Sequence, residues 1–160
     1  MNSLGIALLA LLVPAAGAAP DGPARERLTA AEIDARVSTG PGAGSSGVKG
    51  IETIVLKGDP TKAGLYTILL RVPPHTTIQA HSHPDDRVAT VVAGAWQFGY
   101  GPRFDEAALK ILPPGSFYTE PPHEPHFART GDSGASVQIS GSGPTATHYE
   151  NPRDTPSPTP

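Results

Sequence analysis

The feature that most limits the fold is a series of short apolar runs, each a few residues long and separated from the next by turn-forming residues. The 160 residues include 18 glycines and 19 prolines, which leaves little room for long helices. Many short strands with frequent turns are typical of a β-sandwich or a small barrel, so we expect an all-β domain. The expected strands are 51–56, 65–72, 78–83, 88–93, 96–100, 109–112, 117–119, 126–129 and 137–140.

The chain divides into four expected regions. Residues 1–19 combine a short apolar run with small residues of the Ala-x-Ala kind, which predicts a cleaved signal peptide, with an uncleaved N-terminal anchor as the alternative. Residues 20–47 are expected to hold a short helix, capped by Thr29 and Glu32, followed by a flexible Gly/Ser-rich linker. Residues 48–150 are the expected β-domain, and residues 151–160 a disordered proline-rich tail.

Charge and cysteine content exclude several classes of function. The 12 Lys and Arg against 15 Asp and Glu give a net charge of −3, so nucleic acid is not an expected partner. The chain has no cysteine, which removes disulfides, thiolate metal sites and a cysteine nucleophile. Together with the expected signal peptide, this composition predicts a periplasmic or secreted protein that is not stably inserted in a membrane after cleavage.

Histidines occur in two groups that a β-fold can bring together. His81 and His83 project to the same face of an expected strand, with Gln79 beside them. His126 opens a later strand, after a proline-rich turn. If His126 faces inward opposite the pair, three imidazoles converge, and three neutral nitrogen ligands with open positions are typical of a catalytic metal site.

These two segments resemble the two motifs of the cupin superfamily. The resemblance covers most of residues 48–150 and implies a single-domain jelly-roll β-barrel, often paired as a homodimer. It also implies a divalent metal ion (Fe, Mn, Ni or Zn) held by the three histidines. The matching residues are His81, His83 and Gly94 for the first motif, and Gly115, Pro121 and His126 for the second.

One departure from the family pattern concerns the metal site itself. Arg87 stands where the family usually has a ligand glutamate, and a guanidinium cannot ligate a cation. The site is therefore expected to use three histidines alone, unless Glu120 or Asp86 supplies a displaced carboxylate. Arg87 either points inward and holds a substrate carboxylate or enolate, or lies at the barrel rim, paired with Asp85 or Asp86.

Other residues near the expected barrel mouth have simpler interpretations. His75 and His123 replace glycines of the family motifs, and we expect them to be turn residues rather than ligands. Tyr118 and Gln79 are expected to offer polar contacts to a ligand inside the barrel.

The leading functional hypothesis is a small metal-dependent enzyme of dioxygenase, lyase or isomerase type, acting on a small organic molecule. In this hypothesis Arg87, Tyr118 and Glu120 assist the reaction beside the three histidine ligands. A non-catalytic cupin that binds a small ligand or a metal for sensing or storage is the second hypothesis. A barrel without metal, with structural histidines, is the third.

Overall fold

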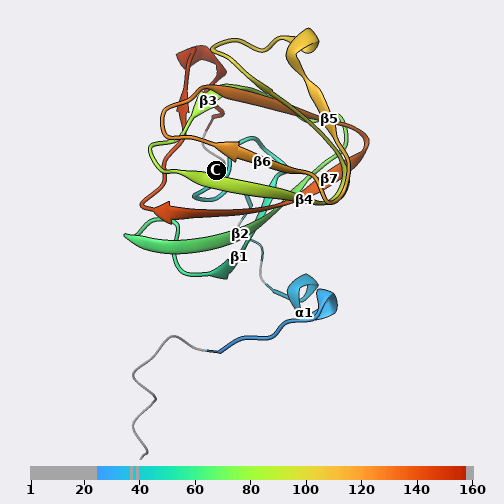
Figure 1. Cartoon of the computed structure of the whole chain (residues 1–160), viewed down its shortest axis with the longest axis vertical. Coiled ribbons are helices and arrows are strands. Elements are labelled where there is room, and N and C mark those ends of the chain that lie inside the picture. The colour runs from blue at the N-terminus through green and yellow to red at the C-terminus, as the bar shows by residue number, and fades with distance from the viewer. Residues whose placement is uncertain (1–24, 37, 39, 158–160) are drawn as a thin grey trace, which may run out of the picture.

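The computed structural model describes residues 25–36, 38 and 40–157, and this part of the chain is built mainly from antiparallel strands. Strand β7 is central, because it pairs with β2, β3 and β4, while β4 also pairs with β5 and β6. Figure 1 shows these strands curling around a common interior, which confirms the expected all-β barrel. The strands are β1 (Glu52–Lys57), β2 (Gly64–Val72), β3 (Thr77–Ser82), β4 (Arg87–Tyr100), β5 (Lys110–Leu112), β6 (Phe117–Glu120), β7 (His126–Gly143) and β8 (His148–Tyr149).

Two strands are longer than the sequence predicted. β4 merges the expected strands 88–93 and 96–100, and β7 runs through the expected turn around Gly134. Gly94 and Gly134 adopt positive φ angles of 75° and 65° within these strands. A Cβ atom on Gly94 would lie 2.1 Å from the Gly134 carbonyl oxygen, so the two strands can approach this closely only at glycine. Both glycines are points of close approach in continuous strands, and the predicted breaks were wrong.

Apolar side chains from all the long strands fill the barrel interior. This core excludes water around the barrel axis and fixes the inward faces of β3, β4, β6 and β7, which carry the residues discussed below. Its most deeply buried members include Ile51, Tyr66, Ile68, Val91, Val137 and Ile139.

The expected short helix is confirmed as α1 (Ala30–Asp34). Thr29 caps its N-terminus, and the Glu32 carboxylate accepts a hydrogen bond from the Thr29 backbone N–H. Figure 1 shows α1 outside the barrel, near β1 and β2, where Asp34 forms an ion pair with Arg71 of β2. In residues 25–36, 38 and 40–157, no helix has the length and hydrophobicity that crossing a membrane requires.

Two segments expected to lack order adopt defined conformations. In the expected linker, Gly44, Ser45 and Ser46 are buried. In the expected tail, Pro152–Asp154 form the short 3₁₀ helix η2, capped by Asn151. A second 3₁₀ turn, η1 (Glu106–Ala108), lies between β4 and β5. The linker prediction failed because its small residues contact the barrel through backbone carbonyls rather than apolar side chains.

The expected signal peptide, residues 1–19, lies outside the described residues.

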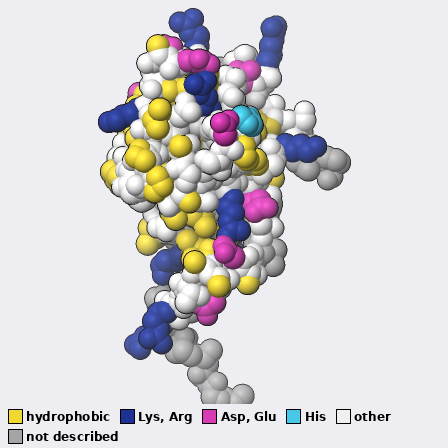
Figure 2. Space-filling view, turned by 90° about the vertical axis from the view of Figure 1, so that its right-hand side faces the viewer, with side chains coloured by type: hydrophobic (Ala, Val, Ile, Leu, Met, Phe, Trp, Pro, Cys, Tyr) yellow, Lys and Arg dark blue, Asp and Glu magenta, His cyan; other side chains and the backbone are white. Residues whose placement is uncertain are grey.

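On the face of the barrel shown in Figure 2, Lys and Arg side chains are interspersed with Asp and Glu, and hydrophobic side chains gather between them.

Candidate metal centre

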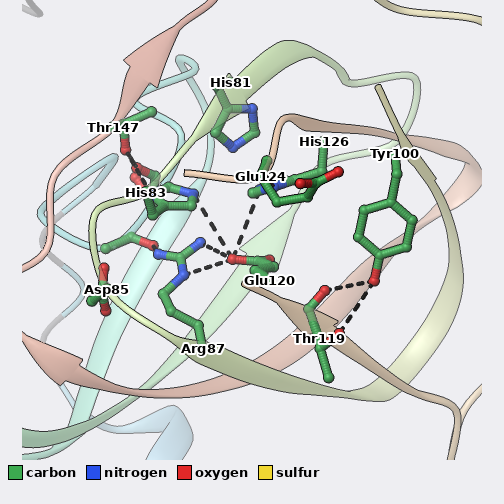
Figure 3. Close-up of polar contacts among 12 residues, drawn as sticks. His81, His83, Asp85, Arg87, Tyr100, Thr119, Glu120, Glu124, His126 and Thr147 are labelled. Atoms are coloured by element: carbon green, nitrogen blue, oxygen red, sulfur yellow. Dashed lines mark hydrogen bonds and ion pairs between the residues drawn. The ribbon is translucent and has the colours of Figure 1, made fainter. Parts of the chain in front are cut away.

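The three histidines converge inside the barrel. His81 of β3 and His126 of β7 are register partners on adjacent antiparallel strands, and His83 follows directly after β3. One ligand nitrogen from each of the three rings lies within 4.8 Å of the other two, and all three side chains are buried. Figure 3 shows the rings of His81, His83 and His126 around a common space. The arrangement supplies the three ligand positions that the two sequence motifs predicted.

Backbone carbonyls set the orientation of each ring. Nδ1 of His81 lies 2.8 Å from the Gln79 carbonyl, Nδ1 of His83 lies 2.7 Å from the Ala146 carbonyl, and Nδ1 of His126 lies 3.0 Å from the Glu124 carbonyl. A carbonyl can only accept, so each Nδ1 carries the proton and each Nε2 keeps its lone pair.

The Nε2 atoms of His83 and His126 are buried and have no hydrogen-bond partner among the described residues. Buried acceptors without donors are rare, and a carbonyl-oriented ring with a free inward nitrogen is the usual form of a metal-ligating histidine. The residues present therefore fit a divalent cation.

The rings are also held in their neutral, ligand-competent form. Burial lowers the pKa of His81 to about 3, and the charge of a protonated His126 would lower it further. Burial, followed by the positive charge of Arg87, lowers the pKa of His83 to about 2. Burial also lowers the pKa of His126. At neutral pH a cation can therefore bind all three nitrogens without displacing protons.

Arg87 points into the barrel and forms an ion pair with Glu120. The two residues lie opposite each other in the register of β4 and β6. The Arg87 Nε donates to Glu120 Oε2 at 2.6 Å, and Nη2 donates to the same oxygen. That oxygen lies 3.8 Å from Nε2 of both His83 and His126. A carboxylate thus stands between the guanidinium and the histidines, as the dashed lines in Figure 3 show.

This geometry decides among the sequence alternatives for Arg87. The rim interpretation was wrong, because Arg87 is 2 % exposed and its carboxylate partner is Glu120. Asp86 is exposed, and Asp85 accepts a hydrogen bond from Tyr66 at 2.7 Å, so neither acid reaches the histidines. Glu120 is the acid that the fold brings to the site.

Both members of the ion pair stay charged despite their burial. Burial raises the pKa of Glu120, but the Arg87 charge and hydrogen bonds, together with the nearby histidines, outweigh this effect and lower the pKa to about 2. Burial lowers the pKa of Arg87, but the charge and hydrogen bonds of Glu120, together with Tyr66 and Asp85, outweigh it and raise the pKa. Without an intervening anion, a guanidinium this close would repel a metal ion. The negative charge of Glu120 offsets this repulsion.

Aromatic side chains form the wall beside the histidines. Phe98 stacks on His126 with 5.4 Å between ring centroids, and Tyr118 packs on Phe98 at 4.1 Å. Burial raises the pKa of Tyr118 well above its ordinary value, so its hydroxyl keeps its proton. Trp96 lines the same cavity. The inward position expected for Tyr118 is thus observed, and Trp96 and Phe98 serve both core and cavity.

Gln79 does not face this cavity, contrary to the expectation. The register of β3 against β7 shifts between Ile78 and His81, and the irregularity turns Ile78 and His81 toward the same cavity. Gln79 reaches the site only through its backbone carbonyl, which orients His81.

His75 and His123 are turn residues, as expected. They adopt left-handed conformations with φ of 54° and 61°, and both are exposed. This backbone conformation explains why the family motifs carry glycine at these positions.

Two cavity residues were missed from the sequence. The cavity beside the histidines has a volume of about 20 Å³, and Gly44 and Ser46 form part of its wall. They lie in the stretch that we expected to be a linker. No local signal separates a Gly/Ser stretch that packs on a site from one that does not.

Comparisons with known proteins identify the fold. The sequence matches no protein-family profile. The polyketide cyclase RemF from Streptomyces resistomycificus is similar in structure, with a TM-score of 0.59 at 18% identity over 79% of this chain and 85% of that one. A sugar phosphate isomerase of the cupin superfamily from Silicibacter pomeroyi gives 0.52 at 19% identity over 74% and 76% of the two chains. A cupin 2 conserved barrel protein from Rhodopseudomonas palustris gives 0.53 at 14% identity over 65% and 69%. The chain therefore has the cupin-type barrel fold, and the structures that share it include enzymes.

Proposed function

We propose that the protein is a metal-dependent enzyme that binds one divalent ion (Fe, Mn, Ni or Zn) through His81, His83 and His126 and acts on a small organic molecule. The observation that carries this proposal is the set of three buried ligand nitrogens within 4.8 Å of one another, with the Glu120 oxygen 3.8 Å from two of them. A structural role for the histidines would not require inward Nε2 atoms without donors. The proposed place of action is the periplasm or the extracellular space.

The residues around the histidines have separate proposed roles. A bound ion would polarise a substrate oxygen or, if it is iron, offer positions for substrate and O₂. Glu120 is a fourth, anionic group beside the ligand nitrogens, and it is placed to accept a proton or to join the ligand set. Arg87 keeps Glu120 ionised and oriented. Tyr118 keeps a protonated hydroxyl at the cavity wall, suited to donate to a developing oxyanion.

Metal analysis of the untagged full chain tests the ligand set. We expect about one divalent ion per chain, lost in His83→Ala and retained in His123→Gly, a matched control at an exposed histidine of the same region. Retention of the ion by His83→Ala, or absence of metal from the wild-type protein, would refute the proposal.

A second function, capture of a metal ion for sensing or storage without turnover, is favoured by one observation. The cavity of about 20 Å³ has room for an ion but not for a substrate in the observed conformation. Incubation of the metal-loaded protein with small β-diketones, phenols, cyanohydrins and thiol acids, with product analysis and O₂ monitoring, separates the two functions. Enzymes convert at least one compound class, whereas a protein that only captures the ion leaves every compound unchanged.

A further inference from the structure

The walls of the small cavity differ in how they are held. Apart from Gly44 and Ser46, every residue that lines it belongs to a strand of the barrel. These strand residues are held by hydrogen-bonded ladders to at least one neighbouring strand, so moving them would break part of the sheet. Residues 44–46, called here the gate segment, have no ladder partners in the described chain. The gate segment is therefore the part of the wall that can move without disrupting the barrel.

The same segment also borders a second, outer space. A pocket of about 380 Å³ lies between residues 41–47 and the C-terminal stretch that includes Thr145, Thr147 and Tyr149. Gly44 and Ser46 line both this outer pocket and the inner cavity. The gate segment is thus a partition between a space large enough for a small molecule and the histidine site.

The gate segment is fastened by three successive backbone carbonyls, each held by one side chain. The Tyr149 hydroxyl donates to the Ser46 carbonyl at 2.7 Å, and the Thr147 hydroxyl donates to the Ser45 carbonyl at 2.8 Å. Arg87 Nη1 donates to the Gly44 carbonyl at 2.9 Å. Two of these hydrogen bonds are neutral and one has a charged donor, and so few bonds can break and re-form without unfolding the domain.

The Arg87 contact links the gate segment to the candidate metal centre. The other two donor nitrogens of Arg87 remain on Glu120, so only Nη1 loses its acceptor when the gate segment moves outward. A buried charged donor without an acceptor is costly, and an incoming oxygen atom would satisfy it. We propose that residues 44–46 are the gate through which substrate reaches the histidines, and that a carboxylate, enolate or carbonyl oxygen of the substrate replaces the Gly44 carbonyl on Arg87. The substrate part of this proposal rests on the proposed function; the gate does not.

The gate is tested without metal by hydrogen exchange at Trp96. This residue is the chain's single tryptophan, it is buried, and it lines the inner cavity, so its indole N–H exchanges with solvent only when water enters. Tyr149→Phe removes one fastening hydroxyl and keeps the ring that packs near His81. We expect indole exchange, followed by NMR in D₂O, to accelerate by about three- to tenfold.

Two comparisons make this result specific. Tyr100→Phe removes a similar hydroxyl-to-carbonyl bond, to Thr119 at 2.6 Å on the outer surface, and should leave indole exchange unchanged. The backbone amides of Val137 and Ile139 report global opening and should not accelerate in Tyr149→Phe. Gly44→Ala provides a second route to an open gate, because its φ is +89° and the added Cβ would lie 2.8 Å from Ile68 Cδ1. Unchanged indole exchange in both gate variants would refute the gate.

The substrate contact is tested with acetate as the probe, bound to the Co²⁺-loaded full chain and followed by the visible absorption of the ion. If acetate binds only after the gate opens, its apparent affinity in Tyr149→Phe rises by the same factor as indole exchange. Faster exchange with an unchanged acetate affinity, or no acetate binding, would keep the gate and overturn the Arg87 contact. Failure of the wild-type chain to hold Co²⁺ would overturn the proposed function and the substrate contact, while the indole measurement would still decide the gate.

Discussion

The substitution Arg87→Met gives the sharpest test of how Glu120 is held. It removes the cation that lowers the pKa of a fully buried carboxylate, while Met keeps much of the side-chain volume. Removing one partner of a buried ion pair typically costs about 3–5 kcal/mol. Glu120 can escape by taking up a proton, which at pH 7 costs about 3.4 kcal/mol for a carboxyl whose ordinary pKa is 4.5. The two figures agree, so we expect the metal-free variant to lose about 3–5 kcal/mol in the free energy of unfolding.

A divalent ion should remove most of this loss. If Glu120 lies within reach of the ion, the ion replaces Arg87 as its counter-charge, and the loss should fall below about 2 kcal/mol in the loaded protein. The control is Arg87→Met/Glu120→Gln, which removes both charges and should recover most of the stability of the metal-free protein. Adding metal should change the free energy of unfolding of this double variant by no more than it changes that of the wild-type protein.

The assay is urea unfolding followed by the fluorescence of Trp96, with EDTA in one series and saturating Zn²⁺ in the other. An equal loss in Arg87→Met with and without Zn²⁺ would show that the ion does not interact with Glu120. A loss below about 1 kcal/mol in EDTA would show that the ion pair is not buried as the structure describes.

Three further predictions follow from the histidines. In the metal-free protein, unfolded histidines take up protons below pH 6.5, while His81 and His83, with pKa values of about 3 and 2, stay neutral in the folded state. The free energy of unfolding should therefore fall by about 5 kcal/mol between pH 6.5 and pH 4.5; a stability that is flat over this window in urea titrations would contradict these pKa values. Because the folded rings are already neutral, the Zn²⁺ affinity measured by calorimetry should change little between pH 7.5 and pH 5.5, and a steep decline through pH 6.5 would indicate solvent-exposed ligands. His123→Gly should raise the free energy of unfolding by about 0.5–1 kcal/mol, because glycine removes the cost of a positive φ; a destabilised variant would show that the His123 side chain contributes contacts that outweigh this strain.

The strands of the barrel and the common face of His81 and His83 could be predicted from local spacing, whereas the meeting of His126 with this pair was implied only by the resemblance to the cupin motifs. Strand periodicity places alternate residues on one face, and the two motifs set His81 and His83 against His126. The breaks placed near Gly94 and Gly134 failed for a non-local reason. A glycine with positive φ usually marks a turn, but here Gly94 makes room for the backbone at Gly134, and Gly134 makes room for the backbone of residues 72–74.

The partner of Arg87 could not be chosen from the sequence. Asp85 and Asp86 are its chain neighbours, whereas Glu120 is 33 positions away and becomes its partner only through the register of β4 and β6. The contribution of residues 44–46 was hidden for a related reason. Their contacts are made by backbone carbonyls, which every residue possesses, so these contacts cannot be predicted from the amino-acid composition.

The face-to-face placement of Arg87 and Glu120 also bears on how such a site can change over evolutionary time. Exchanging the two residues would place an acid at position 87, where the motif that the sequence resembles carries one, and would leave the total charge unaltered. Either half of that exchange, taken alone, sets two like charges against each other in a water-free interior. A lineage that carries this arrangement is therefore separated from the swapped one by an intermediate that folds poorly.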